Sequence, residues 1–478
     1  MSEPLWRWTA ADLVPAIRNR QISSREVTES CLSRLDEVNP AINAVVDVLA
    51  DDALQAAEKA DEAVRMGENL GVLHGVPITV KINVDFAGRP TTNGVVSFKN
   101  LVVGEDSIPV SNLRKSGAVI FGRTNVPGFS TRYFTDNALH GRTLNPWDPE
   151  CTPGGSSGGA AAAVASGIGP IGHGNDRAGS VRQPAFACGV IGLRPTVGRV
   201  PDYNPASIED RGISTQLTHV QGPLARTIAD IRLTLKALSA RDPRDPWWVP
   251  VDEKPNPGRS PVALISSMPG VDVDPAIAKA LQDASRWLEE AGYRIEEATP
   301  PRLTDAADLF WPMLLAEERA ASSATGSLST SAIGVVGDEA VQRARASTRA
   351  YAGELDYSEY IRGLATRTTI LREWQVFFEH YPLLLMPVSW HRPWPIDFDQ
   401  GGDEQVRRML DAHHPLVAVS LLGLPGLSVP TGLADGVPVG VQLVAGRFQE
   451  EQCMAAGEVI EARYSMGTPI DPRGNDSG

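Results

Sequence analysis

Residues 151–167, "CTPGGSSGGAAAAVASG", place four glycines around Ser156 and Ser157 and then pass into small apolar residues. A flexible linker is a poor interpretation, because the preceding "NPWDPECTP" is stiffened by proline and the following "AAAAVAS" favours a helix. We therefore predict a loop at a helix entrance, where glycine lets backbone amides approach a ligand and the helix N-terminus stabilises negative charge. An ordinary helix cap rich in glycine and serine has the same composition, so both interpretations stay open here.

The loop also contains the G-x-S-x-G pattern of a nucleophile elbow, with Ser156 or Ser157 as the nucleophile. An elbow serine follows a buried strand, whereas these serines follow "TPGG". The chain offers no convincing aspartate and histidine downstream: His413 and His414 flank a predicted helix, and His173 lies near a second glycine loop. The context of these serines and the lack of a suitable aspartate and histidine therefore disfavour a Ser-His-Asp triad.

Upstream of this loop, the spacing of apolar residues changes along the chain. Residues 1–66 repeat apolar side chains every three or four positions, which predicts helices with N-caps at Thr9 and at Ser23 or Ser24. Over residues 76–85 apolar and polar residues alternate, which predicts a strand with Lys81 on its polar face. By this alternation alone Lys81 is a surface lysine. A buried strand at residues 118–122 follows a helix, so we predict an α/β core.

Downstream, residues 241–260 are dense in proline and charge and predict a boundary or a long surface crossing. Strands are predicted at 261–267 and 382–388, a helix and strand within 275–298, mostly helices over 300–375, and two strands joined by a Gly/Asp turn within 423–446. We divide the chain into 1–240 (N-terminal helices and core), 241–410 (an α/β continuation with a variable, mainly helical segment) and 411–478 (C-terminal strands and helix). The three parts are expected to form one large domain.

Composition narrows the class of protein. The 478 residues include 44 Lys and Arg against 58 Asp and Glu, a net charge of −14, which disfavours nucleic acid and anionic membrane surfaces as partners. Four scattered cysteines (Cys31, Cys151, Cys188 and Cys453) form no C-x-x-C pair, which argues against a zinc site or a disulfide framework. The sequence shows no membrane-length apolar run and no secretory signal pattern, so we expect a cytoplasmic protein.

A second glycine-rich loop, "GPIGHGNDRAGSVRQPAFACGVIGLRPTVGRVP", follows at residues 169–201. Together with "GVLHGVPITVKIN" (71–83), the first loop, "GPLARTIADI" (222–231) and the C-terminal 423–446 segment, it makes the chain resemble the amidase signature family of amide hydrolases over nearly its full length. The resemblance implies an α/β fold with a large mixed sheet, helices on both faces and a mainly helical insertion over the active site.

The resemblance also implies a catalytic triad of Ser180, Ser156 and Lys81, with Ser156 following a cis peptide bond. In this chemistry a serine hydroxyl attacks the amide carbon and a base must take its proton. A lysine serves as that base only when neutral, and its ordinary pKa of about 10.4 leaves it charged at pH 7. Burial beside Val80 and Ile82 would lower this pKa. Without the resemblance, Ser156 is interpreted as a helix cap and Ser180 as a turn hydroxyl.

The resemblance further implies an oxyanion hole made by the backbone N–H groups of Arg177, Ala178, Gly179 and Ser180, with Asp176 and Ser157 supporting the loops. Four positions depart from the commonest family pattern: Asn175 for threonine, Ala178 for glycine, Ile82 for aspartate and Gly128 for glutamate. If position 178 needed a positive φ, its Cβ would add about 1 to 2 kcal/mol of strain. The loss of two acidic groups at Ile82 and Gly128 suggests a more apolar pocket.

For the substrate and the assembly, the sequence indicates only broad classes. We expect a small aryl or alkyl amide, a carbamate (urethane) or an ester, held by apolar groups of the variable segment: Phe310, Trp311, Met313, Trp390 and Trp394. Core packing explains these five residues equally well. The alternative function is the glutamine-amidase subunit of a tRNA-dependent amidotransferase complex, which "SVRQPA" resembles. We expect no metal and no organic cofactor, and a homodimer is the commonest assembly for a soluble protein.

Overall fold

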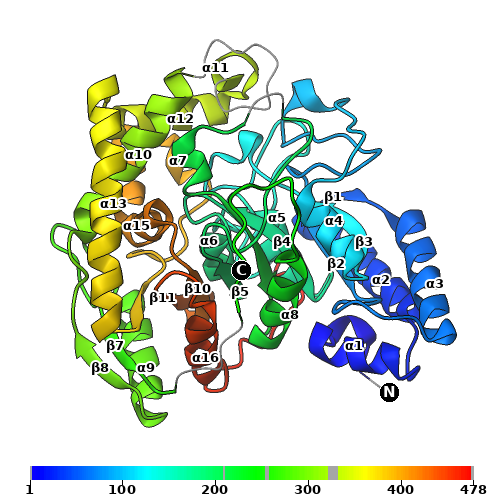
Figure 1. Ribbon diagram of the computed structural model, residues 1–478. Coiled ribbons are helices and arrows are strands. Elements are labelled where there is room, and N and C mark those ends of the chain that lie inside the picture. Colours follow the sequence, from blue (N-terminus) through cyan, green and yellow to red (C-terminus); the bar gives the residue numbers. More distant parts are fainter. Residues whose placement is uncertain (1–2, 208–209, 253–257, 321–331, 475–478) are drawn as a thin grey trace.

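A single mixed sheet runs through the whole protein (Figure 1). The computed structural model describes residues 3–207, 210–252, 258–320 and 332–474. Within these residues the strand order is β1-β3-β2-β4-β6-β5-β10-β11-β9-β7-β8. The strands are β1 (Val45–Val48), β2 (Pro77–Lys81), β3 (Val119–Thr124), β4 (Ile171–Asp176), β5 (Ile191–Arg194), β6 (Val220–Ala225), β7 (Pro261–Leu264), β8 (Arg294–Glu297), β9 (Leu383–Pro387), β10 (Gly426–Ala434) and β11 (Val437–Ala445).

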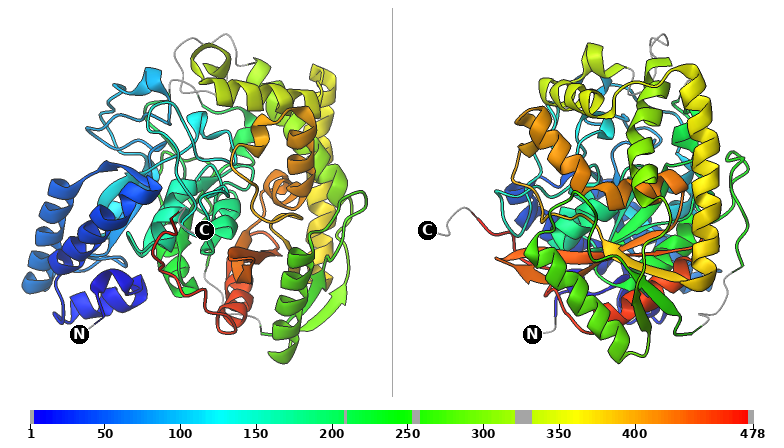
Figure 2. Two further views of the ribbon diagram at one scale, coloured as in Figure 1. Left: turned by 180° about the vertical axis from the view of Figure 1, so that it is seen from behind. Right: turned by 90° about the vertical axis from the view of Figure 1, so that its left-hand side faces the viewer.

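Helices pack on both faces of this sheet (Figure 2). They are α1 (Ala10–Arg18), α2 (Ser24–Ile42), α3 (Ala50–Met66), α4 (Ile108–Lys115), α5 (Gly158–Ala165), α6 (Arg182–Cys188), α7 (Ile213–Gln216), α8 (Ile228–Leu238), α9 (Pro275–Glu290), α10 (Leu303–Ala320), α11 (Ile333–Val336), α12 (Glu339–Ala352), α13 (Tyr357–His380), α14 (Asp403–Ala412), α15 (His414–Leu422) and α16 (Glu450–Glu461). The predicted α/β class with a large mixed sheet is confirmed.

The N-terminal helices begin where the sequence predicts. The Thr9 side chain accepts a hydrogen bond from the Asp12 N–H, and Ser23 forms a capping box with Glu26. The prediction that residues 1–66 are all helical is wrong for β1, which pairs antiparallel with β3. Helix α2 ends because the Asn39 side chain accepts hydrogen bonds from the N–H groups after Asn43, and the chain then extends along the sheet edge.

Strand β2 lies inside the sheet, parallel to β3 on one side and to β4 on the other. All five of its residues are buried, Lys81 included. The surface position that alternation alone predicts for Lys81 is therefore wrong. Helices cover both faces of the sheet, so the alternating polar side chains of β2 do not reach solvent.

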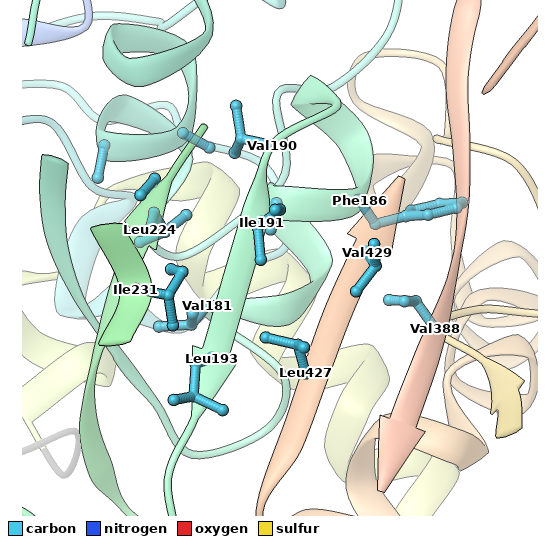
Figure 3. Packing of buried hydrophobic residues seen from close by; sticks show 14 of the residues in the cluster. Val181, Phe186, Val190, Ile191, Leu193, Leu224, Ile231, Val388, Leu427 and Val429 are labelled. Carbon is cyan, nitrogen blue, oxygen red and sulfur yellow. The ribbon is translucent and has the colours of Figure 1, made fainter. Parts of the chain in front are cut away.

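The C-terminal strands and the central strands share one core. Figure 3 shows Phe186 of α6, Ile191 of β5 and Leu427 of β10 in one cluster of buried side chains. Strands β10 and β11 form the predicted hairpin, in which Asp435 and Gly436 both have positive φ angles, as a type I′ turn requires. Strands β7, β8 and β9 and the helices α9, α10 and α13 also match their predicted segments.

The predicted helical segment over 300–375 contains α10 to α13 in its described residues, while 321–331 lie outside them. The proline-rich stretch 241–260 has no helix or strand in its described part, and 253–257 lie outside it. The division into 1–240, 241–410 and 411–478 stays a prediction. No helix in the described ranges has the length and hydropathy that a membrane crossing demands.

Candidate active site

The amine of Lys81 lies at the carboxyl end of β2, against the first glycine loop. Its Nζ is 2.7 Å from the Ser156 Oγ, and both side chains are buried. The Ser156 hydroxyl precedes helix α5, and the Gly155–Ser156 peptide bond is cis. The helix-cap interpretation of Ser156 and Ser157 is not realised, because α5 has no side-chain cap hydrogen bond.

A chain of amide side chains fixes the second contact of Lys81. Its Nζ lies 2.7 Å from the Asn175 Oδ1, because the parallel register that pairs Thr79 with Gly172 brings the ends of β2 and β4 together. Asn175 donates through its Nδ2 to the Asn83 Oδ1 at 2.9 Å. Asn83 in turn donates to Ser130 Oγ at 3.0 Å. The Asn83 Nδ2 also lies 3.4 Å from the Asn175 Oδ1, so this amide oxygen accepts from both Lys81 and Asn83, with Lys81 the closer donor.

The surroundings of Lys81 favour a neutral amine. Burial lowers its pKa well below the ordinary value; the Asp176 carboxylate opposes this shift, and the Arg177 guanidinium adds to it. A neutral lysine carries two N–H groups and one lone pair. Donating one N–H to Asn175 leaves Lys81 able to direct its lone pair at the Ser156 hydroxyl, which is the arrangement a general base needs.

The two serine loops are tied to each other. The Ser157 N–H donates to the Ser180 carbonyl oxygen at 3.2 Å, and the Ser157 Oγ donates to the Asn175 carbonyl oxygen at 3.4 Å. Ser156 and Ser180 line one cavity, where Ser180 is half-buried and Ser156 is buried. Within the described residues no hydrogen bond joins their two hydroxyls. The structure thus brings the three predicted triad residues into one site, with direct contact between Lys81 and Ser156.

Asp176 organises the Ser180 loop. Its buried carboxylate accepts hydrogen bonds from the N–H groups of Gly179 (2.9 Å) and Val181 (3.2 Å) and from the guanidinium groups of Arg182 and Arg194. Burial alone would raise the pKa of Asp176, but the two arginines outweigh it and hold this pKa well below the usual range. Asp176 therefore stays ionised and holds the loop, as the resemblance implies.

The predicted oxyanion donors differ in availability. The Gly179 N–H is occupied by Asp176, whereas the N–H groups of Arg177, Ala178 and Ser180 have no acceptor among the described residues. The positive φ in this loop belongs to Gly179 (101°), and a Cβ there would lie 2.7 Å from Leu416 Cδ1. Ala178 has no positive φ, so the strain considered for it does not arise. The Ala178 carbonyl oxygen accepts from the Tyr133 hydroxyl at 2.6 Å.

The cavity beside Ser180 has a volume of about 250 Å³, and its lining is largely polar. Of the five apolar residues predicted to line it, Trp311 does so, on helix α10. The prediction is wrong for Phe310, Met313, Trp390 and Trp394, which are buried in the core and absent from the lining. Helix α10 lines the cavity with one face, whereas Phe310 and Met313 lie outside that face and pack into the core.

The expectation of a more apolar pocket at Ile82 and Gly128 is wrong. Neither residue lines the cavity: Ile82 is buried in the core, and a Cβ on Gly128 would lie 2.9 Å from a methyl carbon of Val341. The glycine therefore allows helix α12 to pack closely on the loop around Phe129. The polar groups of the cavity come from elsewhere, including Glu317, Glu318 and Arg345 of the helical segment. These three residues were missed by the sequence analysis.

Asn83 and Tyr133 were also missed. Asn83 lies two residues after Lys81, which is a weak signal, and nothing near Tyr133 in the sequence indicates that its hydroxyl reaches Ala178. In the described part of the chain no group of three or more His, Cys, Asp or Glu residues could hold a metal ion.

Comparison with known proteins places this geometry in a family. The family model described as Amidase matches residues 26–454. The chain belongs to the amidase signature family. This amidase is 44% identical over 468 residues to an indoleacetamide hydrolase of Bradyrhizobium diazoefficiens, covering 97% of this chain and 88% of the relative. It is 33% identical to one of the subunits of the glutamyl-tRNA(Gln) amidotransferase of Symbiobacterium thermophilum, covering 91% and 92% of the two chains.

Solved structures are similar to this amidase over the same length. A 6-aminohexanoate cyclic dimer hydrolase matches with a TM-score of 0.85 and 27% identity, covering 99% of both chains. A bacterial aryl acylamidase of the amidase signature family matches with a TM-score of 0.82 and 26% identity, covering 98% of both chains. The protein is thus an enzyme of the amidase class, which hydrolyses carbon–nitrogen bonds of amides.

Proposed function

We propose that this amidase hydrolyses a small aryl or alkyl amide through Ser180 as nucleophile, Ser156 as proton relay and neutral Lys81 as base. The observation that carries the proposal is the 2.7 Å contact between the Lys81 Nζ and the Ser156 Oγ in a site where burial lowers the lysine pKa. A buried lysine that stayed charged would need a carboxylate partner, whereas the two contacts of the Lys81 amine are neutral oxygens.

Acylation begins when the Ser180 oxygen attacks the amide carbon. Its proton passes to Ser156 while the Ser156 proton passes to Lys81, and a carbon–oxygen bond forms. The free N–H groups around Ala178 stabilise the oxyanion of the tetrahedral intermediate. Collapse of this intermediate breaks the carbon–nitrogen bond, and the proton held by Lys81 returns through Ser156 to the leaving amine. Contact between the two hydroxyls forms when substrate binds, since catalytic hydrogen bonds tighten in the substrate complex.

Deacylation repeats the sequence with water. Water gives its proton to the same relay and attacks the ester carbon of the acyl enzyme. The bond to the Ser180 oxygen then breaks, that oxygen recovers a proton, and a carboxylic acid leaves. Carbamates and esters meet the same groups, so both remain within the proposed substrate range.

The substrate class rests on three features. The cavity volume of about 250 Å³ fits a small molecule, and Trp311 gives it one aromatic wall. The relatives named above act on indoleacetamide and on aryl acylamides by name. Together these support a small amide that carries an aryl or alkyl group, and the indoleacetamide in the first relative's name is itself a primary amide.

The deciding experiment measures ammonia release from phenylacetamide by the purified wild type and by Ser180→Ala. We expect Ser180-dependent turnover by the chain alone, and a fluorophosphonate adduct on Ser180 by mass spectrometry. Unchanged turnover in Ser180→Ala would refute the mechanism. A different result would favour the glutamine-amidase role within an amidotransferase complex. In that result L-glutamine is the one amide hydrolysed, and it is hydrolysed only when a partner protein has co-purified with the chain.

A further inference from the structure

The cavity that Ser180 lines also contains an arginine that forms no ion pair within the described residues. Arg177 lies on the same loop, three residues before Ser180, and lines the cavity. Its guanidinium makes no hydrogen bond or ion pair with any residue in the described ranges. Burial lowers the pKa of Arg177 to about 10, so the group is charged at neutral pH and partly stripped of water. A cation in this state is stabilised by an anion that enters the cavity.

Four charged neighbours shift the pKa of Arg177, and each of them contacts another residue. They pair as follows: Arg345 with Glu318, Arg211 with Asp202, and Glu317 with the Ser214 N–H and the Tyr360 hydroxyl. Arg345 and Arg211 lower the pKa of Arg177, whereas Glu318 and Glu317 raise it. Asp210 lines the same cavity, and no carboxylate of the described residues forms an ion pair with the guanidinium. The five donors of Arg177 are thus available to a ligand.

Trp311 lies in the wall of the same cavity. Its side chain is 6% exposed and lines the cavity. The indole N–H is buried and has no hydrogen-bond partner within the described residues.

Three peptide units separate the Cα atoms of Arg177 and Ser180, which therefore lie at most about 11 Å apart. One small molecule can reach both residues in a cavity of about 250 Å³. A planar guanidinium binds a carboxylate through two parallel hydrogen bonds.

We propose that Arg177 binds a carboxylate on the acyl part of the substrate, so that monoamides of dicarboxylic acids are the favoured substrates. This inference rests on the proposed function, since Ser180 must attack the other end of the same molecule. In a primary amide the leaving group is ammonia, so the carboxylate lies on the acyl side.

The test uses two substrates that differ in one group: glutaramate, with a carboxylate opposite its amide, and glutaramide, with a second neutral amide there. Ammonia release gives kcat and KM for each. We expect the wild type to prefer glutaramate, and Arg177→Gln to lower kcat/KM for glutaramate about 10- to 100-fold, mainly through KM. The loss for glutaramide should be clearly smaller than for glutaramate, because Arg177→Gln keeps the backbone N–H of residue 177 and removes only the side-chain charge. Arg177→Lys should recover part of the loss for glutaramate because it restores the charge.

Arg362→Gln is the matched control, since Arg362 is exposed on α13 and the substitution removes the same charge outside the cavity. Binding is measured separately in Ser180→Ala, where glutaramate should raise the melting temperature and adding Arg177→Gln should abolish the shift. Equal losses for both substrates in Arg177→Gln would overturn the inference. So would a wild type that prefers glutaramide, whatever the variants do; Ser180-dependent turnover of phenylacetamide would still leave the proposed function standing.

Discussion

Replacing Asn175 by aspartate tests whether Lys81 works as a neutral base. The change puts a carboxylate oxygen where the amide oxygen now lies, 2.7 Å from the Lys81 Nζ, with almost no change in volume. At an effective dielectric constant of about 20, a full charge at this separation contributes about 6 kcal/mol, or about 4 pKa units, as an upper limit. Because the new carboxylate shares its charge and is itself desolvated, we expect the pKa of Lys81 to rise by about 1 to 3 units.

The direction of the effect on activity follows from the active form. Neutral Lys81 accepts the proton, so kcat/KM falls as pH drops through the lysine pKa in the free enzyme. In the wild type, where burial depresses this pKa, the acidic limb lies below the ordinary pKa of a lysine. In Asn175→Asp the limb should move upward by about 1 to 3 pH units, with activity recovering at alkaline pH.

The assay is the pH profile of kcat/KM on phenylacetamide, accompanied by circular dichroism and thermal unfolding. Asn175→Thr is the control, since a hydroxyl still accepts from Lys81 and adds no charge; its acidic limb should stay close to that of the wild type. An unmoved acidic limb in folded Asn175→Asp would refute the assignment of Lys81 as the base. An equal shift in Asn175→Thr would show that charge is not the cause.

Three other outcomes are expected. Lys81→Met keeps the buried volume and removes the base, so kcat/KM should fall about 10²- to 10⁴-fold without a matching loss of melting temperature; near wild-type turnover would contradict the relay. Asp176→Asn leaves Arg182 and Arg194 facing an uncharged amide in the core and should destabilise the protein by about 3 to 5 kcal/mol in denaturant titrations, whereas an unchanged midpoint would show that the pairs contribute little. Because the folded pKa of Asp176 is depressed, this contribution is present above about pH 4 and fades only in stronger acid. Incubation with EDTA should leave turnover unchanged, since the proposed chemistry uses only serine and lysine groups; inhibition reversed by a divalent ion would overturn that view.

Short-range patterns in the sequence determined much of this protein. The caps at Thr9 and Ser23 and the turn at Asp435 and Gly436 are local events, because a side chain or a φ preference acts within a few residues. The family motifs also located the two serine loops and Lys81. Strand β1 was not predicted, because four residues between two helices are too few to show a period of two that differs from the helical spacing around them.

The tertiary structure decided the chemistry of the site. Alternation in β2 placed Lys81 on a polar face, and only the helices over both faces of the sheet bury it and lower its pKa. Asn175 and Lys81 are 94 positions apart and meet only through the parallel register of β2 and β4. The polar lining of the cavity likewise depends on how α10 and α12 are oriented over the loops. Burial and long-range contact are properties of the packed sheet and helices, so no local pattern in the sequence contains them.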